Sequence, residues 1–332
     1  MTVLTIAPGD IYDPPDEDAK AFVTYKNYAD AFLWIAKDQY PTFTDQATFI
    51  SAQPGASKAR PTDIKPEEIA SLLQGAWSTE LLMAESLETA TNAAIRYANV
   101  WSPIQAYYAV FSAGRAYLKA AGSKATSHRS VLNDLTGRLS RRDLALLPWN
   151  ATANGCPQID QVTYQNLGTT AGLDISNLTV PRSTETAWGV FAKSLKTTRA
   201  DQCEEDFSNW IRNEKPKTAT GKRRKNVLKA DKERIAGKLP STSIFHLMYR
   251  VRIRANYKQT DSFAVGAITP MDSRKFYESQ MELTARNLFT FECLVLGIMG
   301  RRFLRAALLK LASIKNPPPA IERWKPFGVL PD

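Results

Sequence analysis

The sequence predicts a mainly α-helical protein: a helical bundle in two parts, interrupted by a long, partly irregular basic insertion and preceded by an N-terminal helical extension. Two long stretches repeat apolar residues at three- and four-residue steps, which is the spacing of one face of an α-helix. Residues 148–184, between these stretches, are rich in Asn, Gly, Thr and Pro and lack that spacing. Residues 213–238 carry ten basic and three acidic side chains, a net charge of +7 out of +10 for the whole chain.

The bulk composition is that of a globular protein, with 44% hydrophobic and 23% charged residues among 332. No apolar run approaches the roughly 18 residues of a membrane helix, and the acidic N-terminus lacks the cationic region of a signal peptide. Three distant cysteines indicate a reducing compartment, without a disulfide framework or a cysteine zinc site. With two histidines and no phosphate-loop or dinucleotide-binding motif, we expect a cytoplasmic protein without a metal or cofactor.

Residues 1–75 are expected to form an N-terminal arm and a helical extension. A first helix is predicted at about 20–40. Its apolar positions are Phe22, Tyr25, Ala29, Phe32, Leu33 and Ala36. Prolines in 41–65 predict a loop. The run Pro66-Glu67-Glu68 predicts a helix start, because proline fits the first turn and acids favour the positive end of the helix dipole.

Residues 76–140 are expected to form the first part of the bundle. A helix is predicted over 78–99, and the next begins with Ser102 as N-cap and Pro103 in the first helical position. The apolar face of this second helix consists of Ile104, Tyr107, Tyr108, Phe111 and Leu118. A shorter helix is predicted over 127–139.

Residues 141–242 are expected to form the insertion. We expect loops with a short strand pair, such as 160–165 with 175–180, and then helices at 185–197 and 202–213 before the basic segment.

Residues 243–315 are expected to form the second part of the bundle, with helices at 243–257, 272–300 and 301–313. The first of these has a complete apolar stripe, made of Ile244, Leu247, Met248, Val251 and Ala255. Three consecutive prolines from Pro317 predict the end of regular structure and a C-terminal tail at 316–332.

Two tracts of the predicted bundle combine aromatic and polar residues in a recognisable order. The first is WSPIQAYYAVFSAGRAYL at 101–118, followed by Ser127-His128. The second is YRVRIRANY at 249–257, where arginines precede an Asn-Tyr pair. These tracts resemble the helices of HEPN-like domains, and among them the YaaC-like proteins. The resemblance covers about 78–140 and 243–300 and implies that the two stretches form one bundle.

The resemblance also implies a range of functions. Many HEPN domains are ribonucleases of toxin–antitoxin and antiviral defence systems, commonly dimers, with an Arg-x4–6-His motif. Such an arginine would stand at 121–123 for His128 or at 239–241 for His246, and neither segment contains one. We therefore expect a non-catalytic nucleic-acid-binding component of a prokaryotic defence or stress system, with RNA preferred and a homodimer as a possible state.

The basic segment is the strongest candidate for phosphate contacts, because clustered cations attract phosphate backbones without reading sequence. On the 243–257 helix, Arg252 and Arg254 lie about 80° to either side of the apolar stripe, with Arg250 near Arg254. The expected nucleic-acid contacts are Lys222, Arg223, Arg224, Lys225, Lys229, Lys232, Arg250, Arg252 and Arg254.

Glu292 is a lone acid in the apolar run FECLVL. We expect it to form a structural ion pair with Arg252 or Arg254 between two helices of the bundle.

Two other functions remain open at this stage. A metal-independent ribonuclease would use His128 as general acid or base, and Arg115 or Arg254 to stabilise the phosphorane. A scaffold protein would instead dock an acidic partner subunit on the basic loop. Purely structural roles are also compatible with the sequence. His128 would then fix a turn, and Tyr107 and Tyr108 would pack in the core.

Overall fold

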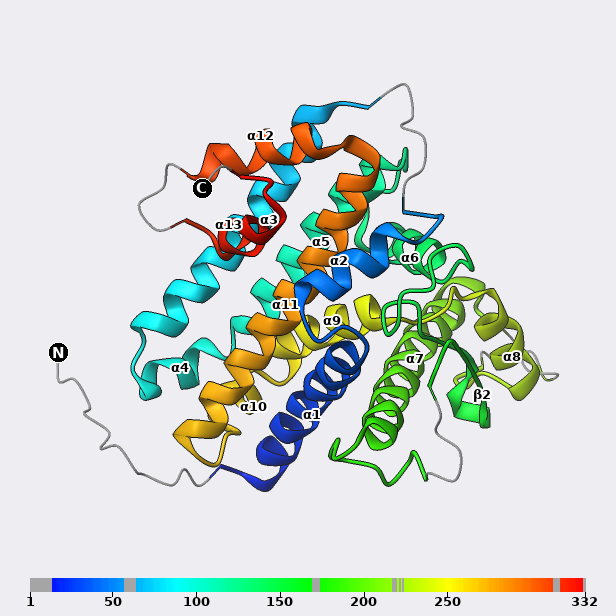
Figure 1. The fold of residues 1–332 in the computed structure, drawn as a ribbon. Helices are drawn as coiled ribbons and strands as arrows, with labels where there is room; N and C mark the ends of the chain where they lie inside the picture. The colour runs from blue at the N-terminus through cyan, green and yellow to red at the C-terminus, as the bar shows by residue number, and fades with distance from the viewer. Residues whose placement is uncertain are drawn as a thin grey trace.

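The computed structural model describes residues 14–56, 64–168, 174–216, 220, 222, 224–312 and 317–330. Within these ranges it contains thirteen α-helices and one small two-stranded sheet, so the predicted mainly α fold is confirmed (Figure 1).

The body of the protein is a helical bundle built around two long helices from opposite halves of the chain. Helix α5 (Ser102–Ala120) packs along both α3 (Pro66–Thr89) and α11 (Pro270–Met299), and α9 (Ile244–Ile253) packs on α5 (Figure 1). The two stretches separated by the insertion therefore share one core, as predicted. Helix α6 (His128–Leu139) completes this part and begins at Ser127, whose hydroxyl accepts from the backbone N–H of Ser130.

Further helices surround this centre. They are α1 (Asp16–Gln39), α2 (Phe43–Ser51), α4 (Asn92–Ala98), α10 (Thr260–Val265), α12 (Arg301–Ala312) and α13 (Pro319–Trp324). The N-terminal extension belongs to the main core, because α1 packs on both α7 (Thr184–Glu214) and α11. Phe32 of α1 meets Trp149 and Phe191 edge-on, with ring centroids 5.3 and 5.6 Å apart.

Several element boundaries differ from the sequence prediction. The predicted loop at 41–65 contains α2, which Thr42 and Asp45 cap reciprocally. Helix α3 begins at Pro66, as predicted, but runs unbroken to Thr89 where we predicted a second helix over 78–99, and α7 is one helix where we predicted two. Pro319 begins α13, so the predicted end of regular structure there is wrong.

The strand prediction is half right. Strand β2 (Gln161–Gln165) matches the predicted 160–165, but its antiparallel partner is β1 (Thr152–Cys156). Residues 175–177 form a turn, and 178–180 are irregular and form no strand. At the end of α9, Arg254–Lys258 continue as a short π-helix.

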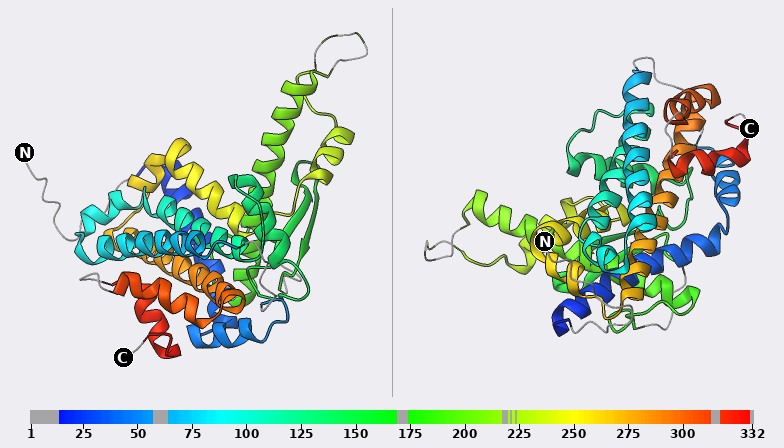
Figure 2. Two further views of the ribbon diagram at one scale, coloured as in Figure 1. Left: turned by 90° about the horizontal axis from the view of Figure 1, so that it is seen from above. Right: turned by 90° about the vertical axis from the view of Figure 1, so that its left-hand side faces the viewer.

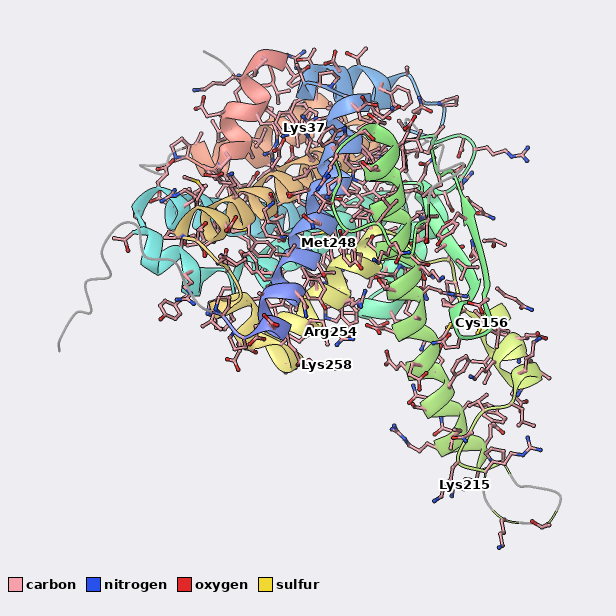
Figure 3. The ribbon with its side chains drawn as sticks, turned by 90° about the horizontal axis from the view of Figure 1, so that it is seen from below. Lys37, Cys156, Lys215, Met248, Arg254 and Lys258 are labelled. Carbon is pink, nitrogen blue, oxygen red and sulfur yellow. The ribbon has the colours of Figure 1, made fainter. Side chains whose placement is uncertain are left out.

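Helix α7 extends beyond the bundle and forms a protruding arm with α8 (Lys229–Lys238) (Figure 2). Figure 3 shows Lys215 at the far end of this arm. The arm has its own small apolar cluster, separate from the main core, which contains Cys156, Cys203, Phe207 and Ala236. The described residues of the basic segment 213–238 therefore lie outside the bundle.

Arg199 fastens the base of the arm. Its side chain is 1% exposed and donates to backbone carbonyls on both sides: Nε to Gly155 at 2.9 Å and Nη2 to Ala236 at 2.8 Å, while Nη1 donates to Pro240. Burial lowers the pKa of Arg199, but the carbonyls at the end of α8 favour its charge because they carry the negative end of the helix dipole.

The predicted pairing of Glu292 with Arg252 or Arg254 is wrong. Arg323 of α13 reaches into the core, where its Nη2 lies 2.7 Å from Glu292 Oε1 and its Nη1 lies 2.6 Å from Glu80 Oε1. Indole N–H groups complete the shell of Glu292: Trp77 donates to Oε1 at 2.7 Å and Trp324 to Oε2 at 2.5 Å. Both carboxylates are fully buried, so α13 ties α3 and α11 together.

Candidate functional site

An aromatic–arginine cluster forms where α5, α9 and the first turn of α6 meet. We define this aromatic–arginine cluster as Tyr107, Tyr108, Phe111, Arg115, His128, Tyr249 and Arg252. The seven residues come from three segments that lie up to 145 positions apart in the sequence. Tyr107 is buried beneath the cluster, and Tyr108 is 40% exposed at its surface.

His128 lies at the centre of the cluster. Its ring stacks on Phe111 with centroids 4.5 Å apart, and its Nδ1 lies 2.6 Å from the hydroxyl oxygen of Tyr107. Burial lowers the pKa of His128, and the charges of Arg252 and Arg115 lower it further. Burial also raises the pKa of Tyr107, so its hydroxyl keeps the proton, and in one of the two imidazole tautomers it donates to Nδ1. The neutral imidazole then presents Nε2–H as a donor.

Arg252 covers three tyrosine rings of the cluster. Its guanidinium carbon lies 5.0 Å from the ring centroid of Tyr108, 5.7 Å from that of Tyr107 and 5.6 Å from that of Tyr249. One Nη donates to the Tyr108 hydroxyl at 2.6 Å. Its Nε is buried without a hydrogen-bond partner.

Arg115 is the second arginine of the cluster whose charge acts on His128. Its guanidinium lies 5.9 Å from the centroid of Phe111, and its Nε is also buried without a partner. Neither Arg115 nor Arg252 forms an ion pair with any described carboxylate. Two cations therefore flank a neutral histidine without a counter-charge, and such an arrangement favours an anion.

Arg250 of α9 and Arg254, the first residue of the π-helix, pair with Asp201 of α7 and not with the cluster. Arg250 Nε lies 2.7 Å from Asp201 Oδ2 and Arg254 Nη2 lies 2.9 Å from the same oxygen, as the predicted grouping of Arg250 with Arg254 requires. Both line a cleft of about 550 Å³ between α7 and α9. Figure 3 shows Arg254 and Lys258 on the bundle beside the arm. Asp201 offsets the charge of Arg250 and Arg254. Of the two arginines proposed to act with His128, Arg115 is the one whose charge acts on it.

The basic side chains of the arm differ in whether they contact an acidic or aromatic side chain. Lys222, Lys225 and Lys229 are exposed and form no ion pair with any described residue. Arg224 lies 3.5 Å from Asp231, and Lys232 lies over the ring of Phe207 at 5.9 Å. Arg223 is outside the described residues.

His246 is a structural histidine. It is 5% exposed; its Nδ1 accepts from the Ser243 backbone N–H at 3.3 Å, and its Nε2 lies 3.3 Å from Asn133 Oδ1. Burial lowers its pKa to about 3, below the value of about 6.5 in the unfolded chain.

This depressed pKa predicts a loss of stability in acid. Between pH 3 and 6.5 the unfolded chain binds the additional proton, so the free energy of unfolding falls with falling pH and is fully restored above 6.5. From pH 7 to pH 5 the loss from His246 should be about 2 kcal/mol. Urea denaturation at several pH values measures it. The variant His246→Gln should remove this part of the pH dependence, and an unchanged pH profile in that variant would contradict the assignment.

The sequence missed two residues of the candidate site. Tyr249 was noticed only as part of a motif, although it contacts both His128 and Tyr107, with ring centroids 5.8 and 5.5 Å apart. Trp101 was assigned no role, but it is 58% exposed. The seven-residue spacing of Trp101, Tyr108 and Arg115, which brings them to one face of a helix, was the available signal.

Within the described ranges, no three His, Cys, Asp or Glu side chains gather as metal ligands would. None of the helices in the described part of the chain is both long and apolar enough to cross a membrane. Comparison with known proteins finds no matching family model, no matching curated protein and no matching solved structure.

Proposed function

We propose that this protein binds nucleic acid without cleaving it, that RNA is the preferred ligand, and that the protruding arm makes the main phosphate contacts. The observation that supports this most directly is the position of Lys222, Lys225 and Lys229: exposed, outside the bundle, and without an ion-pair partner among the described residues. Cations in this state can exchange their counterions for phosphates, which is the main source of sequence-independent affinity.

The preference for RNA and a role in prokaryotic defence or stress are supported by the resemblance of the 101–118 and 249–257 tracts to HEPN-like domains. A non-catalytic role is supported by the lack of an arginine at 121–123 and 239–241. Assembly as a homodimer remains part of the same proposal.

Replacing Lys222, Lys225 and Lys229 by alanine should weaken RNA binding strongly. If about five phosphates are contacted, the binding constant of the wild type falls with salt at a log–log slope of roughly −3.5 to −4.5. Loss of three contacts should reduce that slope by about 2 to 3 and lower affinity at 0.1 M salt by about 10²-fold. Filter binding over a salt series measures both quantities.

The matched control is a triple alanine variant of Arg302, Arg305 and Lys310, which are exposed on α12. It loses the same charge from a different surface, so its slope should stay near that of the wild type. Equal losses in the two variants would show a general charge effect and reject the arm as the site. No RNA affinity in the wild type, with salt-sensitive binding of an acidic protein, would select the scaffold function instead.

The ribonuclease alternative is favoured by one observation, which is the neutral His128 between Arg115 and Arg252. Its Nε2 could transfer a proton while a guanidinium stabilises charge on phosphorus. Cleavage of RNA in EDTA that disappears in His128→Ala, but persists in His246→Gln, would establish this activity over simple binding.

A further inference from the structure

We infer that the surface formed by Trp101 and the aromatic–arginine cluster is a second nucleic-acid site, which binds single strands by stacking bases on Trp101 and Tyr108 and holding a phosphate between Arg252 and Arg115. This inference rests on the proposed function, which it extends from phosphate attraction by the arm to recognition of unpaired bases on the bundle.

The first step is the exposure of the rings. Trp101 is 58% and Tyr108 is 40% exposed, although tryptophan and tyrosine are usually mostly buried. Trp101 is the N-cap of α5, with helical backbone angles, and Tyr108 follows it by seven residues. Seven residues of an α-helix turn by 700°, so both side chains lie on the same side, about 10 Å apart along the helix axis. Exposed aromatic faces in a row are the platform on which successive unpaired bases stack.

The second step is the charge that accompanies the rings. Arg252 leans over Tyr108 from α9, with its guanidinium 5.0 Å from the ring centroid, and Arg115 follows Tyr108 by seven residues on the same face of α5. No described carboxylate pairs with either guanidinium. The Nε of each guanidinium is buried without a hydrogen-bond partner, so a phosphate beside the two guanidinium groups would supply the counter-charge that no described carboxylate provides.

The third step is the state of His128. In the tautomer in which Nδ1 accepts from the Tyr107 hydroxyl, Nε2–H is available to donate to a phosphate oxygen beside the two arginines. The imidazole does not add a third positive charge, since burial and the two guanidinium groups lower its pKa. The site therefore combines two cations, one neutral donor and two ring faces.

The arrangement selects single strands. In a duplex the base faces are already stacked on their neighbours, so the rings of Trp101 and Tyr108 can be covered only by unpaired bases. The arm, which attracts phosphates of any nucleic acid, does not make this distinction.

The experiment compares binding of a single-stranded RNA of mixed sequence with binding of the duplex that it forms with its complement, using the full chain. Trp101→Ala and Tyr108→Ala should each weaken single-strand binding by at least about fivefold and leave duplex binding unchanged. Tyr108→Phe keeps the ring and should retain most of the affinity. Arg252→Gln should reduce the salt slope for the single strand by about 1.

Matched controls separate stacking from general damage. Trp34→Ala removes a tryptophan that is 41% exposed on α1, away from the cluster, and should leave both affinities unchanged. In the wild type the single strand should quench part of the tryptophan fluorescence, and Trp101→Phe should abolish that quenching, which gives a direct reading of stacking on this side chain.

The outcomes distinguish the two proposals. If the wild type binds RNA and the arm variant loses affinity, but Trp101→Ala and Tyr108→Ala weaken single-strand and duplex binding equally or not at all, this site is rejected and the proposed function stands. If the wild type binds neither form, both are rejected. Equal binding of single-stranded DNA would keep the stacking site and remove the preference for RNA.

Discussion

Replacing Arg323 by methionine should lower the free energy of unfolding by about 3–5 kcal/mol, because it leaves two buried carboxylates without their counter-charge. Glu80 and Glu292 are fully buried, and Arg323 is the cation that contacts both. Burial raises the pKa of Glu80, an effect that the charge of Arg323 opposes. Without Arg323, the folded protein must protonate one carboxylate or separate α13 from the bundle.

Urea denaturation measures this loss, and its pH dependence identifies the cause. Carboxyls whose pKa is raised in the folded state destabilise it more as the pH rises. The deficit of Arg323→Met should therefore be larger at pH 8 than at pH 5.5. Adding Glu80→Gln and Glu292→Gln to this variant should recover much of the loss. A deficit that is below about 1 kcal/mol and independent of pH would show that the ion-pair cluster does not stabilise the bundle.

Replacing Arg199 by methionine should release the arm while the bundle stays folded. Arg199 supplies three charge-assisted hydrogen bonds to carbonyls at the base of the arm, each worth about 1.5–3 kcal/mol. The apolar cluster that remains is small and separate from the main core. We expect the free energy of local opening of α8 to fall by about 3 kcal/mol or more.

Hydrogen exchange of the amides of α8 measures that opening. Exchange in α8 should accelerate by about 10²-fold or more, while the amides of α5 and α11 stay protected. Arg199→Lys keeps the charge but not the planar fork of donors, so it should restore only part of the protection. Unchanged exchange in α8 would show that the apolar cluster alone holds the arm.

The sequence predicted the centre of the bundle well because its helices are amphipathic. The stripe from Ile244 to Ala255 is buried at each of its five positions, and these residues lie in α9 and its continuation. The positions of α5, α6 and α11 followed from the same periodicity, but Ser102, the predicted N-cap of α5, is the first helical residue and follows the N-cap Trp101.

Helices α2 and α13 and strand β1 were not predicted because their local residues are typical of loops or of the ends of helices. The prolines around 41–65 hid α2, although Thr42 and Asp45 have the spacing of a reciprocal cap. Pro319 was interpreted as a terminator, whereas a proline in the first turn of a helix costs no hydrogen bond. Strand β1 contains Asn154 and Gly155, which disfavour strands, and its pairing depends on β2 rather than on its own composition.

The candidate site could be predicted only in part, since it depends on contacts between distant segments. His128, Arg115 and Arg252 were identified as candidates, but Arg252 or Arg254 was also expected to pair with Glu292, because Glu292 is an isolated acid in an apolar run. The actual partner of Glu292 is Arg323, which lies in a segment predicted to have no regular structure. No periodicity along one helix reveals which charged side chains from other segments will reach it.

The separation of the arm's apolar cluster from the main core affects which substitutions the protein can tolerate. Exposed lysines on the arm contribute nothing to the packing of the bundle, so they can be exchanged, added or lost without a penalty in folding. The proposed attraction for polyanions could thus be adjusted by surface substitutions alone, whereas Arg199, which joins the arm to the bundle, is expected to tolerate almost no replacement.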